Sequence, residues 1–202
     1  VKRTINGQTK RYIEMLLPRW NGDKDAIEDA KFWDSAITYD STSTSTITGL
    51  WHLEGQSVYA LADGDVQGPF TVASGRITLT TAASTVQVGL TYTSEMEDLP
   101  VNQQTALGAR QGRLTVINQV VLKLRYSRGL YAGPGSDTDA LLPLKVREGQ
   151  AAWDTAITPY TGDTYPQSLD GKWDLDGTIL IRGTPGVPFE VLSIHKDVTV
   201  GG

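Results

Sequence analysis

Two-residue alternation of apolar and polar side chains dominates this chain, and the three- and four-residue spacing of a helix is scarce. Alternation of this kind turns one side of an extended strand toward a core and the other toward water. The runs are short and separated by turn-forming pairs, which is typical of a small barrel or sandwich. We therefore predict an all-β fold. The central runs are Val58–Ala62, Phe70–Val72, Ile77–Thr80 and Val86–Leu90, and the turns are Asp63-Gly64, Gly68-Pro69 and Ser74-Gly75.

The pattern divides the chain into three predicted parts. Residues 1–33 contain Asn6-Gly7, a preferred pair for a two-residue hairpin turn, and are expected to be a hairpin and linker that join the second sheet. Residues 34–100 are expected to form a small β-barrel-like subdomain. Residues 101–202 are expected to form an antiparallel β-sheet or sandwich subdomain.

Three segments carry more specific expectations. The Ser/Thr tract Asp40–Thr46 cannot pack a core and is predicted to be an exposed loop. Val101–Gly112 is polar without an apolar period, which favours a crossing segment. Leu114–Tyr126 is predicted to be the longest strand, with the following residues on one face: Val120, Leu122, Leu124 and Tyr126.

Composition excludes several classes of protein. The chain has no cysteine and only two histidines, His52 and His195, which excludes a disulfide scaffold, a cysteine nucleophile and a Cys/His zinc site. No apolar run is long enough to span a bilayer. The chain starts at Val1 without a leader, so we expect it to be a piece of a longer protein.

Charge is distributed unevenly. The overall formal net charge is -5. Residues 34–100 carry one base, Arg76, and eight acids, which gives 1 − 8 = −7 for this stretch. Such a region repels phosphate and disfavours tight wrapping of nucleic acid.

Motifs that could carry chemistry are incomplete. Asp174 and Asp176 precede Gly177 as in part of a calcium loop, but Lys172 stands at the first ligand position and Gly183 at the last, so a turn is favoured. Gly-x-Ser-x-Gly is absent, and neither phosphate-binding glycine motif occurs.

Two further patterns stay open at this point. Each histidine has an acid two residues on, Glu54 and Asp197, which would form a shared site only if the two strands met; a packed histidine is favoured. Paired carboxylates for glycoside hydrolysis are spatial, and the acids here mostly flank turn glycines. We predict no catalytic, cofactor-binding or metal-binding residues.

The tryptophans allow two interpretations. They could be core residues, or platforms that stack on carbohydrate or anchor an interface, and core is favoured. The five are Trp20, Trp33, Trp51, Trp153 and Trp173.

One stretch resembles a known family. Ser45–Gly64 reads STITGLWHLEGQSVYALADG and contains the pattern Gly-Leu-x-His-Leu-Glu-Gly-x-x-Val. With segments in the same order before and after it, the chain resembles the C-terminal region of the tail nozzle, or tail tubular protein B, family of short-tailed bacteriophages. The further segments are Arg11–Glu14, Phe32–Tyr39, Val72–Leu79, Val88–Tyr92, Leu99-Pro100, Ser127–Leu130 and Pro188–Ile194.

The resemblance implies a β-rich virion protein of the phage tail, without catalytic residues or cofactors. It implies a ring of copies, usually a hexamer, below the portal and adaptor, with neighbouring adaptor and fibre proteins and a channel through which DNA passes without specific binding. Trp51 departs from the family pattern, where a polar or acidic residue is commoner, and the tract at 41–46 looks long. An acidic 34–100 region facing the channel would keep DNA sliding.

The glycines of this pattern also have a local explanation. Turns with positive φ at Gly49 and Gly55 would place Leu50 and Leu53 inward. His52 is then expected to hold the turn by a hydrogen bond.

We therefore expect a non-enzymatic structural component of a short phage tail. The alternative is a carbohydrate-binding or tailspike-like receptor-recognition module, which would use Trp51 or Trp173. A third possibility is an isolated β domain with a peptide-binding edge.

Overall fold

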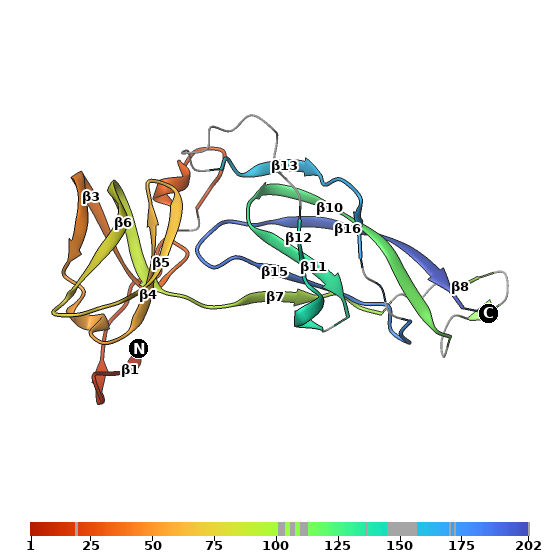
Figure 1. Ribbon diagram of the computed structural model, residues 1–202, viewed down its shortest axis with the longest axis horizontal. Coiled ribbons are helices and arrows are strands. Elements are labelled where there is room, and N and C mark those ends of the chain that lie inside the picture. Colours follow the sequence, from red (N-terminus) through yellow and green to blue (C-terminus); the bar gives the residue numbers. More distant parts are fainter. Residues whose placement is uncertain are drawn as a thin grey trace. The chain divides into compact units, whose positions relative to one another are not determined.

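The computed structural model describes residues 1–18, 20–100, 104–105, 108–109, 113–135, 137–144, 157–169, 171 and 173–201. Strands make up 57% of these residues and helices, all short 3-10 turns, 5%, which confirms the all-β prediction (Figure 1). The chain forms two compact units. Unit 1 comprises Val1–Tyr92, Gln150–Thr158 and Pro185–Pro188, and unit 2 comprises Thr93–Gly149, Pro159–Thr184 and Phe189–Gly202.

Unit 1 is built on a four-stranded antiparallel sheet in the order β3-β6-β4-β5. The part expected to be barrel-like is thus an open sheet, with β3 and β5 at its edges in the described pairing. Four strands are fewer than the five or more of small barrels. The bounds are β3 (Asp34–Thr48), β4 (Ser57–Ala62), β5 (Asp65–Thr71) and β6 (Arg76–Leu90).

Both faces of the central strand β4 are covered. Val58 and Ala60 lie in a cluster with Ile47 and Val88, closed on one side by the 3-10 turn η2 (Trp51–Leu53). Leu61 faces the other way, into a second cluster near the 3-10 turn η1 (Ile27–Asp29). A strand buried on both faces gives unit 1 two small cores.

The Ser/Thr tract Asp40–Thr46 is not a loop, contrary to the sequence prediction. It is the middle of β3 and pairs with β6, with Asp40 opposite Thr85 and Thr46 opposite Thr78, across several register shifts. Threonine is β-branched and favours the extended conformation even where no core is available, so exposure alone did not make this tract a loop.

The opening hairpin forms as predicted but belongs to unit 1. β1 (Lys2–Ile5) pairs with β2 (Gln8–Arg11) around Asn6 and Gly7, both at positive φ. The expectation that residues 1–33 join the second sheet is wrong, because Arg3 bonds to Asp34 at the start of β3 and Ile5 is buried.

Unit 2 contains two four-stranded antiparallel sheets. One centres on β10, which pairs with β13, β14 and β16; the other has the order β12-β11-β15-β7. Apolar residues of both sheets share one cluster, as in a sandwich. The bounds are β7 (Ser94–Glu97), β10 (Thr115–Ser127), β11 (Leu130–Pro134), η3 (Thr138–Ala140), β12 (Leu142–Pro143), β13 (Tyr160–Asp163), β14 (Gln167–Ser168), β15 (Ile179–Gly183) and β16 (Val191–Val200).

The predicted alternation of β10 is confirmed at Val120, Leu122 and Leu124, which are buried. It is wrong at Tyr126, which is only half-buried and has a positive φ where the register with β13 shifts. β10 has 13 residues and is not the longest strand, because β3 and β6 have 15 residues each. Ile117 is buried too, out of phase with them, because the register with β16 shifts between Ile117 and Gln119. A bulge of this kind reverses which face a side chain takes.

The structure tests the expected boundary at residue 100 but describes little of the expected crossing segment. β7 pairs with β15, so unit 2 starts before the expected boundary at residue 100. The crossing segment at Val101–Gly112 lies outside the described residues, apart from the small pair β8 (Gln104–Thr105) and β9 (Gly108–Ala109). Among the described residues, no helix has the length and apolar character to traverse a bilayer.

Candidate functional site

The glycine-flanked turn of the Gly49–Gly64 segment has the predicted geometry. Gly49 and Gly55 have φ of 92° and 74°. Leu50 and Leu53 are fully buried. The turn is therefore a cover for the core of unit 1, tied by the bond from the Leu50 amide to the Gly75 carbonyl oxygen (2.9 Å).

Glu54 holds a neighbouring turn. Ser74 and Gly75, which form this turn, both have positive φ. The Glu54 carboxylate accepts from the Ser74 amide (2.8 Å) and from the Gly75 amide (2.7 Å). A carboxylate engaged by two backbone donors is a structural cap, not a free acid or base.

Trp51 lies flat against the same turn. A Cβ atom added at Gly75 would lie 2.5 Å from the indole ring, so only glycine leaves room for it. The ring is nevertheless 66% exposed. Trp51 is thus an outward-facing side chain, and the core interpretation fails for it.

His52 also bonds to backbone. Its Nε2 lies 2.9 Å from the Ser35 carbonyl oxygen, which can only accept, so Nε2 carries the proton. The ring meets the edge of Tyr12, with centroids 6.4 Å apart. The predicted hydrogen bond is confirmed, but its partner is at the start of β3 and not in the histidine's own turn.

Asp63, like Glu54, accepts hydrogen bonds from backbone amides. Its carboxylate accepts from the amides of Ser84 (3.1 Å) and Thr85 (2.8 Å). Gln67 does the same with its side-chain oxygen for Thr80 and Thr81. The side chains of unit 1 therefore supply acceptors to β6 amides where its pairing with β3 is irregular.

Glu14 joins the hairpin to the sheet. Its carboxylate accepts from Ser35 Oγ (2.5 Å) and from Nε and Nη2 of Arg3 (3.2 and 3.3 Å). The bond from Ser35, and then the bond from Arg3, hold the pKa of Glu14 below its ordinary value. The bond to Glu14 raises the pKa of Arg3.

The residues around Glu14 are apolar and point into water. Ile13 and Leu16 are fully exposed and Met15 is largely exposed. An apolar run of this kind on a folded surface typically marks a contact with another molecule.

The acids of residues 34–100 do not form one surface. Five lie in unit 1, and Glu95, Glu97 and Asp98 lie in unit 2. Glu95 pairs with Arg182, and Asp98 pairs with Lys196 (2.7 Å). The local sum of −7 therefore overstates the charge that any single face presents.

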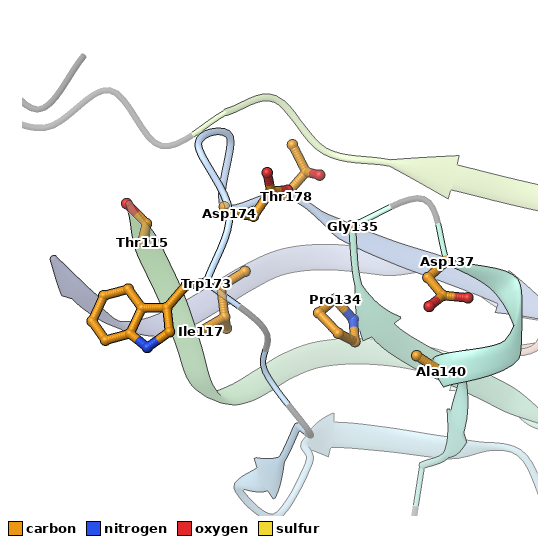
Figure 2. A pocket seen from close by; sticks show the side chains of 10 residues that line it. Thr115, Ile117, Pro134, Gly135, Asp137, Ala140, Trp173, Asp174 and Thr178 are labelled. Carbon is orange, nitrogen blue, oxygen red and sulfur yellow. The ribbon is translucent and has the colours of Figure 1, made fainter. Parts of the chain in front are cut away.

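Unit 2 has a pocket of about 290 Å³, shown in Figure 2. Trp173 lies at one end of this view and Asp137 at the other, with Asp174 and Thr178 along one side. The apolar side chains between them come from β10 and β11. The lining consists of Thr115, Ile117, Pro134, Gly135, Asp137, Ala140, Trp173, Asp174, Gly177 and Thr178.

The Asp174–Gly177 segment forms a turn beside this pocket, as the sequence favoured. Asp174 exchanges two backbone hydrogen bonds with Thr115, and its Oδ1 accepts from the Leu175 amide (2.6 Å). Gly177 has φ of 58°. In the described part of the chain, no three or more His, Cys, Asp or Glu side chains are grouped so that they could hold a metal ion.

The remaining candidates do not converge. His195 Nε2 lies 3.0 Å from Ser193 Oγ, and Asp197 is opposite Gln119. His52 belongs to unit 1 and His195 to unit 2. Trp153 lies outside the described residues.

Two tryptophans of unit 1 bear out the core interpretation at least in part. Trp33 is buried and stacks on Tyr59 with centroids 6.2 Å apart. Trp20 packs against the same cluster. Trp173 is 52% exposed, so the core interpretation fails for it as it does for Trp51.

Sequence reasoning missed the caps and the pocket. The sequence signal for the caps was an acid or amide directly before a glycine, as in Glu54-Gly55, Asp63-Gly64 and Gln67-Gly68. The backbone amides that these side chains bind lie far along the chain, so the sequence does not identify them. Comparison with known proteins adds no name: no family model matches the chain, and no curated protein matches it.

Proposed function

We propose that this chain is a non-enzymatic structural module of a short phage tail, in which copies of it form part of a ring-shaped channel for DNA ejection. The observation that carries the proposal is how His52, Glu54 and Asp63 are used in the segment that resembles the tail nozzle family. Each bonds to the protein's own backbone. General acid or base catalysis needs a group that reaches a substrate proton, and these three are engaged in support.

The edges of the unit 1 sheet support assembly into a ring. A long open edge strand pairs readily with another chain. β5 carries Pro69, which has no amide to donate. β3 has no proline over its 15 residues, and in the described pairing only β6 binds it. We expect the open edge of β3 to lie at a contact between copies.

The exposed apolar run at Ile13–Leu17 supports the same conclusion. Glu14 fixes this run to the start of β3 through Arg3 and Ser35, so its apolar side chains are displayed from an anchored backbone. Displaying them in water costs free energy that burial against a neighbouring copy recovers. In the proposed tail this contact is lateral, and adaptor and fibre proteins bind elsewhere.

The DNA channel can be tested by duplex binding. A conduit must not hold phosphate, and unit 1 carries more acids than bases along β3 to β6. Fluorescence anisotropy with a labelled DNA duplex should detect no nanomolar binding at physiological salt. Nanomolar binding that persists as salt is raised would contradict the conduit.

The same preparation also tests the non-enzymatic part of the proposal. Incubation with bacterial surface polysaccharide should leave its chain length unchanged by gel filtration. Cleavage that is lost when a single carboxylate is replaced by its amide would favour the tailspike-like alternative.

A further inference from the structure

We propose that the pocket of unit 2 binds a neutral hexose ring of a glycan, a role separate from assembly into a ring. The pocket is mixed in character: Ile117, Pro134 and Ala140 supply an apolar floor, and polar side chains surround it (Figure 2). A pyranose has the matching character, because its C–H groups gather on one face and its hydroxyls project from the edge. Small-molecule sites commonly combine an apolar lining with a few placed polar groups.

Trp173 is held in place at the end of this pocket. A Cβ atom added at Gly201 would lie 3.3 Å from Cζ3 of the indole, so the chain after β16 packs closely against the ring. The indole remains half exposed. An aromatic ring that is braced and exposed loses little conformational entropy when a ligand stacks on it.

The carboxylate next to Trp173 is also positioned. Asp174 is fixed by its two backbone bonds to Thr115, and Oδ1 is engaged by the Leu175 amide. Oδ2 is on the side of Gly135, where even an added Cβ atom would stay 3.9 Å away. This oxygen has room to accept a hydrogen bond from a ligand.

Thr178 offers an acceptor as well. It donates its hydroxyl proton to Glu97 (2.7 Å), which leaves its oxygen lone pairs for a donor. Asp137 also lines the pocket, and its carboxylate accepts from the Asp139 amide (3.0 Å). In the described part of the lining, the acceptors at Asp174 and Thr178 favour a ligand that donates hydrogen bonds over phosphate or sulfate.

A neutral polyol fits better than a cation. The Lys196 ammonium donates to the Gly177 carbonyl oxygen (3.0 Å), beside the pocket, and pairs with Asp98 (2.7 Å). Asp98 neutralises this ammonium, so the preference for a neutral polyol rests on the apolar floor, which the C–H face of a pyranose can cover and a cation cannot.

The experiment is ligand-observed NMR with the whole chain. The probes are the methyl glycosides of glucose, galactose, mannose and N-acetylglucosamine, with methyl glucuronide and arginine amide as charged comparisons. We expect at least one neutral glycoside to bind. Trp173→Ala should weaken its binding about tenfold.

Two variants separate stacking from hydrogen bonding and from folding. Asp174→Asn keeps the acceptor for the Leu175 amide and should also weaken binding. Trp51→Ala removes another exposed indole, in unit 1, and should leave binding unchanged. Circular dichroism of each variant checks the fold.

Three results would overturn the proposal. They are binding of no neutral glycoside, binding that Trp173→Ala leaves unchanged in a folded variant, and tighter binding of arginine amide than of every glycoside.

Discussion

Two carboxylates of unit 1 and two carboxylates of unit 2 have different partners. In the sheet of unit 1, Glu54 and Asp63 accept hydrogen bonds from backbone amides and have no cation beside them in the described structure. In unit 2, Glu95 and Asp98 pair with Arg182 and Lys196. The difference shows that an acid-rich stretch of sequence is not by itself a charged binding surface. Glu54 and Asp63 replace missing strand partners, whereas Glu95 and Asp98 neutralise bases.

The largest loss of stability in unit 1 should come from a cavity in the core beneath its turns. Leu53→Ala removes a fully buried side chain of η2 and should lower the free energy of unfolding by about 2–5 kcal/mol. Urea unfolding followed by tryptophan fluorescence measures this. Leu192→Ala, at an exposed position of β16, is the matched control and should change stability by less than about 0.5 kcal/mol.

The next largest effect should come from the ion pair of unit 2. Asp98→Asn keeps the oxygen that accepts from the Ile179 amide but removes the charge facing Lys196, whose side chain is only 12% exposed. We expect a loss of about 2–3 kcal/mol, because a partly buried ammonium is left without its counter-ion. The exposed Asp197→Asn is the control, and equal stability of the two variants would contradict the ion-pair account.

Glu54→Gln should have a smaller effect that does not depend on salt. The amide keeps one acceptor for the turn at Ser74 and Gly75 and loses the other, which costs about 1 kcal/mol. Repeating the unfolding at high salt should leave this loss unchanged, since no cation is involved. Glu28→Gln in η1 is the control. A loss that disappears at high salt would mean that Glu54 acts through its charge and not through its turn.

The smallest effect should come from Glu14 and should depend on pH. Its pKa is depressed in the folded chain, so its contribution is present above the ordinary value of about 4.3 and is lost as pH falls through the depressed value. Glu14→Gln should therefore lower stability at neutral pH by less than about 1 kcal/mol. The gap to the unsubstituted chain should close as the pH falls below the ordinary pKa of a glutamate and through the depressed pKa of Glu14. A gap that stays constant over a pH series of urea unfolding curves would contradict this assignment.

Local features of this fold could be predicted from the sequence, and features that join distant segments could not. Alternation located β10, and residue chemistry located the turn at Asn6-Gly7 and the left-handed glycines Gly49 and Gly55. The same reasoning assigned the hairpin to the wrong unit, because the contact between Arg3 and Asp34 exists only in the folded chain. Polarity also misled at Asp40–Thr46, where β-branching outweighs exposure.

The candidate sites show the same limit. Glu54 and Asp63 stand out in the sequence, but their partners on the Ser74-Gly75 turn and on β6 depend on strand register. The pocket draws on β10, β11, η3 and the turn at Asp174, which no sequence spacing connects. The sequence singled out Trp173 only as one of five tryptophans, and Asp174 and Gly177 only as parts of an incomplete calcium-loop motif.

The most direct test of the structural role is the molar mass of the purified chain by light scattering over a tenfold range of concentration. The account predicts a mass that rises with concentration toward a closed multiple of 21.9 kDa, such as a hexamer. Leu16→Asp, which places a charge in the exposed apolar run, should lower that mass at each concentration. A mass that stays at 21.9 kDa throughout would contradict the ring.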